Sequence, residues 1–252
     1  MIELGLWTTV LLLAIVLLIC IGSGMRIGLV MGLVGILMMV FLLGGKIKLA
    51  SLGILQYNIT ADNYALVSLP LFIFMGYLIL HIGLADRLFA GSTPMVGFIP
   101  GGLLHANIFC CAIFSAMCGS SLATAATIGA IAIPKEIDEL KYPRRSVVGS
   151  LAAGGTLGIL IPPSITFICY GVFVGTSIGQ LFMAGLLPGI ILAGIFMSYI
   201  FMAAIIRPST AGERIGFSLK NIFLGFGKMW PTFLIILLVL GSIFLGITTP
   251  TE

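Results

Sequence analysis

Two short stretches combine helix-breaking residues with hydroxyl side chains inside apolar sequence: CGSS at 118–121, and GGTLG at 154–158 followed by PPS at 162–164. Glycine in a helix interior costs about 1 kcal/mol and proline about 3 kcal/mol relative to alanine, so both stretches are expected to interrupt helices. An interrupted helix leaves carbonyl oxygens unpaired at one end and N–H groups unpaired at the other. The carbonyls, with Ser and Thr hydroxyls, can coordinate Na+, and the N–H ends can face a carboxylate. The candidate sodium and substrate ligands are Gly119, Ser120, Ser121, Thr124, Gly154, Gly155, Thr156, Gly158, Pro162, Pro163 and Ser164.

The composition around these stretches is that of a membrane protein. Of the 252 residues, 60% are hydrophobic and 8% are charged, whereas a soluble domain carries about 25% charged residues. Alternating strands of a closed barrel are not evident, so an all-α polytopic membrane protein in a lipid bilayer is expected. The net charge of +4 lies in loops, which argues against nucleic acid as a partner. The five cysteines lie in apolar segments and are interpreted as small hydrophobic residues, not as disulfides or zinc ligands.

Apolar runs of about 20 residues predict spanning helices, here at 4–21, 27–43, 67–84, 181–206 and 230–247. The run at 95–133 is expected to be a re-entrant hairpin, because the part after CGSS is too short to cross a bilayer. The run at 146–176 is expected to be a broken helix. The predicted parts are 1–94, with scaffold-like helices, 95–180, with the hairpin and the broken helix, and 181–252, with connecting helices and the start of a second repeat.

The distribution of Lys and Arg predicts the orientation. With the N-terminus outside and both arms of the hairpin opening to one face, ten of the twelve Lys and Arg lie inside, and only Lys46 and Lys48 lie outside. A single crossing by 95–133 would reverse this bias. We therefore expect a periplasmic N-terminus. The stretch at 134–145, which is mixed in charge, is expected to be a solvated cytoplasmic loop.

The stretches GSSLATAATIGAIAIPKEI and AAGGTLGILIPPSI, preceded by SLPLFIFMGYLI and followed at the end by GITTPTE, resemble the large membrane subunit of tripartite ATP-independent periplasmic (TRAP) transporters. The resemblance covers essentially the whole chain. One departure is Glu136, where the family often has methionine. The resemblance implies an elevator-type ion-transporter fold in the bacterial inner membrane, of which this chain is the first half of an inverted repeat. The motif TPTE at the end has the residues of a helix N-cap with a capping box, which also predicts that this is an N-terminal portion.

The resemblance further implies a sodium-driven importer of organic acids, such as C4-dicarboxylates, sialic acid or sugar acids. Its partners would be a small TRAP membrane subunit and a periplasmic substrate-binding protein, and no organic cofactor is implied. Gly119, Ser120 and Ser121 would form a first sodium site with the backbone of 154–158 and 162–164. Thr248 and Thr249 would contribute near a second site.

Two alternatives compete with the transporter. An intramembrane serine protease would use Ser120 or Ser121 with His105 as base, but about fifteen residues of helix separate them by about 22 Å, so no enzyme is expected. A non-transporting scaffold is the other alternative. His105 and Asn107 could form a packing hydrogen bond or a proton relay, since an ionisable side chain inside a membrane segment is a functional candidate.

Overall fold

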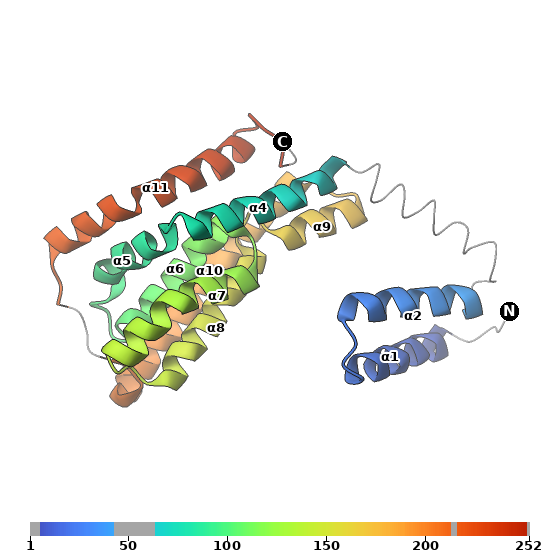
Figure 1. The fold of residues 1–252 in the computed structure, drawn as a ribbon, viewed down its shortest axis with the longest axis horizontal. Helices are drawn as coiled ribbons and strands as arrows, with labels where there is room; N and C mark the ends of the chain where they lie inside the picture. Colours follow the sequence, from blue (N-terminus) through green and yellow to red (C-terminus); the bar gives the residue numbers. More distant parts are fainter. Residues whose placement is uncertain (1–5, 43–63, 213–215, 251–252) are drawn as a thin grey trace. The chain divides into compact units, whose positions relative to one another are not determined.

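The computed structural model is all-helical and describes residues 6–42, 64–212 and 216–250. The chain divides into two compact units, 1–63 and 64–252. In the first unit, α1 (Leu6–Gly22) and α2 (Ile27–Leu42) pack against each other (Figure 1). Both helices match predicted spans to within two residues. The three functional parts predicted from the sequence follow other boundaries and stay a prediction.

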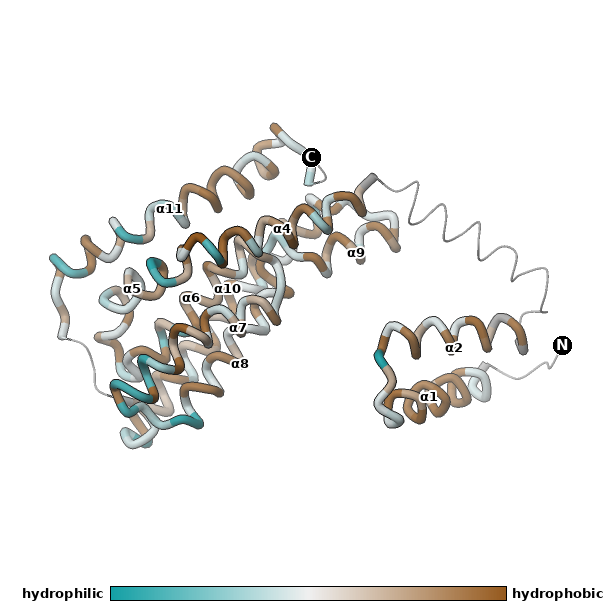
Figure 2. Tube along the Cα trace, viewed as in Figure 1, coloured by the Kyte–Doolittle hydropathy of each residue, from teal (hydrophilic) through white to brown (hydrophobic). Residues whose placement is uncertain are grey.

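The second unit is a bundle in which α6, α7, α8 and α10 lie side by side, with α4, α5 and α11 along it (Figure 1). Its elements are η2 (Tyr64–Val67), α4 (Ser68–His81), α5 (Leu84–Val96), α6 (Leu103–Cys118), α7 (Ser121–Ile133), the π-helical segment η3 (Pro134–Glu139), α8 (Arg144–Leu160), α9 (Ile165–Val174), α10 (Ile178–Ile206), η4 (Pro208–Thr210) and α11 (Leu219–Phe244). Along the chain trace, hydrophilic residues gather at one end of this bundle, in the first part of α11 and where α4 meets α5, while most other residues are apolar or intermediate (Figure 2).

Within the described ranges, three helical segments are long and apolar enough to cross a membrane: Arg144–Val174, Ile178–Ile206 and Leu219–Phe244. A fourth span is possible if α4 and α5, which bend by 66° where they meet, count as one. A polytopic membrane protein is therefore compatible with the fold. The bend lies at Gly83, the residue directly before α5. Its φ of 72° is in the left-handed region, which glycine adopts readily.

The helix–turn–helix formed by α6 and α7 lies at the centre of the second unit. Thirteen of the sixteen α6 residues are buried, and α6 packs against α4, α5, α7, α8 and α10. The turn falls at the predicted CGSS stretch. The first arm begins at Leu103 and not at residue 95 as predicted, because residues 95–102 form the end of α5 and two glycine-containing turns. Entry of this hairpin into a membrane from one face stays a prediction.

Three expectations are wrong in detail. Helix α5 is not among the predicted spans, and its sequence mixes small, charged and apolar residues and contains Pro94. Helix α11 begins at Leu219 and not at Trp230, so Lys220 and Lys228 lie within the helix. Lysine has a good helix propensity, and its long stem lets the ammonium reach water.

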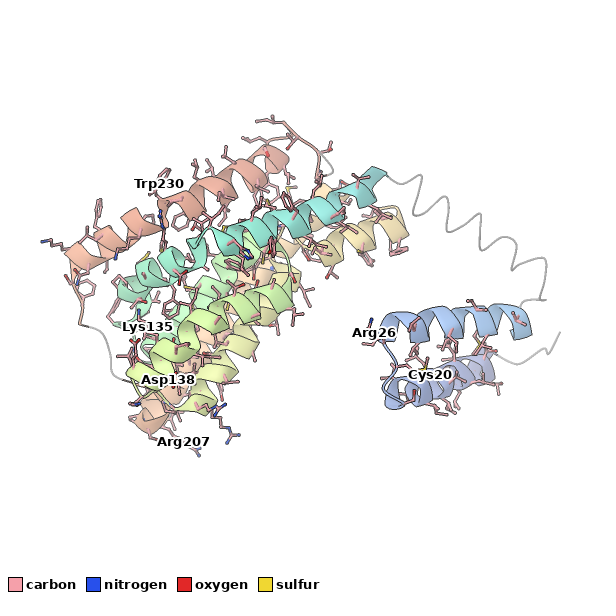
Figure 3. All side chains as sticks on the ribbon, viewed as in Figure 1. Cys20, Arg26, Lys135, Asp138, Arg207 and Trp230 are labelled. Atoms are coloured by element: carbon pink, nitrogen blue, oxygen red, sulfur yellow. The ribbon has the colours of Figure 1, made fainter. Side chains whose placement is uncertain are left out.

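The third error concerns the predicted solvated loop at 134–145. Its first six residues form the π-helical segment η3, and Glu136 is completely buried there. Asp138 and Glu139 are exposed, as expected. Lys135, Asp138 and Arg207 lie at the same end of the second unit (Figure 3). The prediction therefore holds for the outer face of this segment and fails for the face toward α6 and α8.

Candidate ion and substrate site

The hairpin tip is shaped by one glycine and one serine. Gly119 has φ 61°, and its N–H donates to the Ser115 carbonyl at 3.0 Å, which ends α6 with a left-handed cap. Ser120 is extended and begins α7, and its Oγ accepts from Ala123 N at 3.4 Å. A Cβ at Gly119 would collide with the carbonyl oxygen of Pro163. Only glycine fits this tip, for conformational and steric reasons together.

The break between α8 and α9 is shorter than the sequence predicts. Helix α8 runs without interruption through Gly154–Gly158 to Leu160, so these glycines are not unwound. The break consists of residues 161–164. Ile161 and Ser164 have extended backbones, and α9 begins at Ile165. The expected interruption of the helix at 154–158 is therefore wrong. Sodium ligation by this backbone stays a prediction, and it concerns the last turn of α8, where helix carbonyls have no partner within the helix.

The glycines of α8 allow the helix to approach the hairpin closely. A Cβ on Gly154 would lie 2.9 Å from Cys111 Cβ, and one on Gly155 would lie 2.7 Å from Ala125 Cβ. A Cβ on Gly158 would lie 2.7 Å from the backbone nitrogen of Ser121. Small residues permit such contacts between membrane helices. Tertiary packing thus explains why α8 stays helical despite its glycines.

The tip and the break contact each other directly, as the two sequence motifs predict. The backbone N–H of Ile165 donates to the Gly119 carbonyl at 3.3 Å. A Cβ on Gly119 would lie 3.2 Å from Ser164 Cα. Four helix ends therefore meet here: the C-termini of α6 and α8, and the N-termini of α7 and α9. The C-terminal ends present carbonyls and the N-terminal ends present N–H groups.

Two hydroxyls at this junction are buried and lack a hydrogen-bond partner among the described residues: Ser121 Oγ and Ser164 Oγ. Thr124 is also buried, and its Oγ1 lies 3.4 Å from Ser115 Oγ and 3.3 Å from Cys118 Sγ. Thr156 differs, since it is exposed and its hydroxyl donates to Ala153 O at 2.6 Å. The structure therefore brings the predicted serines together and leaves the Thr156 side chain outside.

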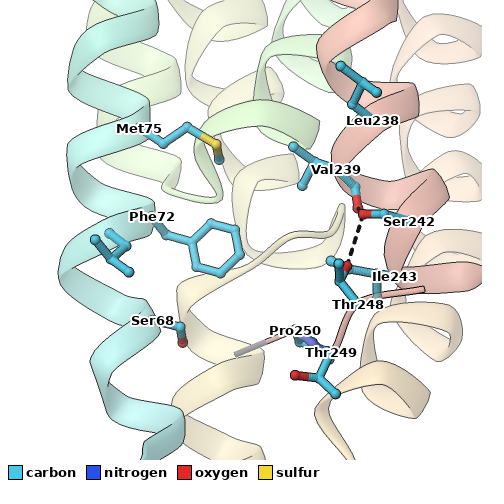
Figure 4. Close-up of a pocket in the computed structure, with 11 residues that line it drawn as sticks. Ser68, Phe72, Met75, Leu238, Val239, Ser242, Ile243, Thr248, Thr249 and Pro250 are labelled. Atoms are coloured by element: carbon cyan, nitrogen blue, oxygen red, sulfur yellow. Dashed lines mark hydrogen bonds between the residues drawn. The ribbon is translucent and has the colours of Figure 1, made fainter. Parts of the chain in front are cut away.

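Thr248 and Thr249 lie elsewhere, in a cavity of about 330 Å³ between α4 and the end of α11 (Figure 4). Thr248 Oγ1 donates to Ser242 Oγ at 3.0 Å, and the other walls are mainly apolar. Helix α4 connects this cavity to the tip, because Met75 lines the cavity while its neighbour Gly76 contacts Cys118. The predicted second sodium site near these threonines stays a prediction. Thr251 and Glu252 of the predicted capping box lie outside the described residues.

The geometry does not support a serine hydrolase. His105 lies in the first turn of α6, and its Nε2 is 2.8 Å from the carbonyl oxygen of Pro100. Ser120 and Ser121 follow the opposite end of α6. A nucleophile and its base must lie within hydrogen-bonding distance. These residues do not.

Sequence reasoning missed one polar cluster, in which Asn107 Nδ2 donates to Glu136 Oε2 and to Ser150 Oγ, each at 3.0 Å. All three residues are buried. A signal was present in the spacing, because Gly129, Ala132 and Glu136 recur at intervals of three and four and thus share one buried helical face.

Comparison with known proteins assigns the family. The model of a family described as "Tripartite ATP-independent periplasmic transporter, DctM component" matches residues 12–252. The chain belongs to the DctM family. It is similar to the C4-dicarboxylate TRAP transporter large permease protein DctM of Pseudomonas aeruginosa, with 38% identity over 77% of this chain and 44% of the relative.

Two further relatives show how the names in this family vary. The sialic acid TRAP transporter large permease protein SiaM of Vibrio cholerae is 36% identical over 76% of this chain and 44% of the relative. The isethionate TRAP transporter permease protein DctMQ of Oleidesulfovibrio alaskensis is 36% identical over 76% of this chain and 30% of the relative. The chain spans less than half the length of these relatives. The relatives are permeases and not enzymes, and the apolar helices of this chain fit a bacterial inner-membrane protein.

Proposed function

We propose that this DctM-family chain forms part of the large membrane subunit of a sodium-coupled importer of organic acids. A periplasmic substrate-binding protein would deliver the substrate, and a small membrane subunit would complete the complex. The hairpin and the broken helix would belong to a transport domain that moves as an elevator. The N-terminus would be periplasmic, as the distribution of Lys and Arg predicts.

The meeting of four helix ends at the tip and the break is the observation that supports this proposal. Discontinuous helices in secondary transporters direct their N-termini at anionic substrate groups and use carbonyls at helix C-termini to coordinate Na+. Here Ser121 Oγ and Ser164 Oγ are buried oxygens without a partner among the described residues, in the segments that follow the ends of α6 and α8. Hydroxyl and carbonyl oxygens are the ligand type that hard cations prefer. The donor set therefore suits Na+.

The proposed substrate class is an organic anion. Relatives are named for C4-dicarboxylates, sialic acid and isethionate, and these substances share an acidic group. The tip at 118–121 and the segment 158–165 contain no Lys or Arg. In this part of the site, the anion would be met by the N–H groups that begin α7 and α9, whose helix dipoles favour negative charge.

The test is sodium-dependent uptake by the complete transporter in proteoliposomes, with Ser121→Ala and Ser164→Ala compared with Thr156→Ala. Thr156 is the matched control because its hydroxyl bonds within its own helix. Loss of one ligand hydroxyl costs about 1.4 kcal/mol, a tenfold rise in the sodium concentration for half-maximal uptake. Ser120→Ala combined with Ser121→Ala should abolish sodium dependence, although it also removes the cap of α7.

Unchanged sodium dependence in the Ser121 and Ser164 variants would refute the assignment of the site. The scaffold alternative is tested by binding alone. Na+ in place of K+ should raise the thermal unfolding temperature of the wild-type chain, because a ligand that binds only the folded state stabilises it. A chain that responds equally to both ions would favour the scaffold.

A further inference from the structure

Glu136 occupies an unusual position for an acidic residue. It lies in η3, directly after α7, at the end of the hairpin opposite the tip, and its exposed fraction is 0%. Its Oε2 accepts from Asn107 Nδ2 of α6 at 3.0 Å, and the same nitrogen donates to Ser150 Oγ of α8 at 3.0 Å. The backbone oxygen of Glu136 accepts from Tyr142 N at 2.7 Å. Glu136 thus joins η3 to α6 directly, and to α8 through Asn107.

The orientation of the Asn107 amide follows from Ser150. The Ser150 hydroxyl donates its one hydrogen to the Val147 carbonyl at 2.8 Å, so its oxygen can only accept from Asn107. The NH2 group of Asn107 therefore faces both Ser150 and Glu136. A metal ion at this position would meet an amide donor instead of an oxygen. The cluster is consequently unsuited to Na+.

The hydrogen bonding of Glu136 is too sparse for an ionised carboxylate. Its Oε1 has no hydrogen-bond partner among the described residues, and neither has Asn107 Oδ1. A buried charge requires a counter-charge or several hydrogen bonds. The nearest candidate for a counter-charge is the ammonium of neighbouring Lys135. That ammonium lies over the ring of Phe89, with Nζ 5.2 Å from the ring centroid.

The other groups that surround Glu136 do not replace a counter-charge. Asp138 and Glu139 on the same segment are exposed and carry negative charge. The packed face of α6 adds the buried thiol of Cys110 and the amide of Asn107, and the face of α8 adds the Ser150 hydroxyl. The Arg144 and Arg145 side chains at the start of α8 are exposed.

We propose that Glu136 is a proton-binding site: it carries a proton while η3 is packed against α6 and α8, and it releases that proton to water when this packing opens. The protonated carboxyl becomes a donor as well as an acceptor, so it needs fewer partners than the anion. The site stands on burial and hydrogen bonding at the base alone. It holds whether or not the tip binds sodium.

The acidity of Glu136 agrees with this geometry. Its segment lies outside the helices that are long enough to span a membrane. Burial raises the pKa of Glu136 from 4.5 to about 7, and the hydrogen bond from Asn107 and the charge of Lys135 act in the opposite direction. The packed state therefore binds the proton more tightly than the open state. Its stability is greatest below pH 4.5 and falls as the pH rises through about 7.

The decisive measurement is an infrared titration of the purified chain in lipid nanodiscs, with the glutamates isotopically labelled. The C=O band of a protonated, buried carboxyl should disappear with a midpoint near pH 7. Glu136→Gln should lack this titration, whereas Glu139→Gln, an exposed glutamate of the same segment, should retain it. Thermal unfolding should follow: the wild-type unfolding temperature should fall between about pH 5 and pH 8, and that of Glu136→Gln should not.

Two results would overturn the proposal. One is a wild-type band that is lost with a midpoint at or below about pH 5, because this is the range of an ordinary glutamate. The other is a neutral-range titration that persists in Glu136→Gln. If Glu136→Gln does not fold, the midpoint in the labelled wild-type chain still decides. Glu136→Met then supplies an apolar replacement of similar size.

Discussion

The contact between α8 and the hairpin tip predicts different effects for two alanine substitutions on one helix. Gly158→Ala would place a Cβ 2.7 Å from Ser121 N and 2.8 Å from Ser120 C. Both neighbours are backbone atoms, so no side-chain rotation relieves the contact. Gly149→Ala, on the same helix, would place its Cβ in open space. The two variants gain the same helix propensity, and only one meets an obstacle.

The magnitude follows from two terms. Alanine stabilises a helix interior by about 1 kcal/mol relative to glycine, which is the whole effect expected at Gly149. At Gly158 the distance from the added Cβ to the nearest tip atom must grow from 2.7 Å to at least the 3.4 Å of ordinary contact. Overpacking of this kind costs about 1–3 kcal/mol. The gain in helix propensity cancels when the two variants are compared. The free energy of unfolding of Gly158→Ala should therefore be about 1–3 kcal/mol lower than that of Gly149→Ala.

The assay is thermal unfolding of both variants under identical detergent and salt conditions. One kcal/mol corresponds to about 2–4 °C for chains of this size. Gly149→Ala should therefore unfold above the wild type, and Gly158→Ala at least about 2 °C below Gly149→Ala. If Gly158→Ala stabilises the chain as much as Gly149→Ala does, α8 does not contact the tip and the proposed meeting of helix ends is wrong.

Two further substitutions test the packing around the hairpin. Gly91→Ala would place a Cβ 2.6 Å from Gly225 O. It should therefore lower the free energy of unfolding by about 1–3 kcal/mol and speed hydrogen exchange in α11. Gly227→Ala, whose Cβ would lie in open space, is the control, and equal exchange rates in both variants would contradict the contact. Tyr142→Phe removes the oxygen that accepts from Leu103 N at 3.3 Å and should lower the free energy of unfolding by about 1–3 kcal/mol, whereas an unchanged denaturation midpoint would show that this bond contributes nothing.

Local signals were sufficient to predict the turn of the hairpin. Glycine readily adopts the left-handed conformation seen at Gly119, and serine is a preferred helix cap, as at Ser120. These preferences act within a few residues. The contact between this tip and the segment 162–164 is different, because no local rule joins residues more than forty positions apart. It was predicted through the resemblance to a family and through the idea that two breaks serve one site.

The same local rules failed where tertiary packing dominates. The unfavourable propensity of Gly154, Gly155 and Gly158 predicted an unwound segment, yet their lack of a side chain is what lets α8 approach the hairpin. Glu136 was assigned to a solvated loop because its neighbours are charged. Its burial depends on Asn107 and Ser150, which lie 29 residues before and 14 after it in the sequence. Such partners are invisible to a reading of neighbouring residues.

The distribution of unsatisfied polar atoms separates the two proposed sites. Among the described residues, most buried side-chain atoms without a partner occur either where the tip meets the break, in Ser121 and Ser164, or at the base, in His105, Asn107 and Glu136; Thr232 of α11 lies apart from both groups. Between the two groups, α8 and the hairpin are closely packed through small residues, and Thr127 of α7 is a further buried hydroxyl without a partner there. The tip offers several oxygens and four helix ends, which suit a metal ion and an anion. The base offers one carboxyl beside an amide donor, which suits only a proton.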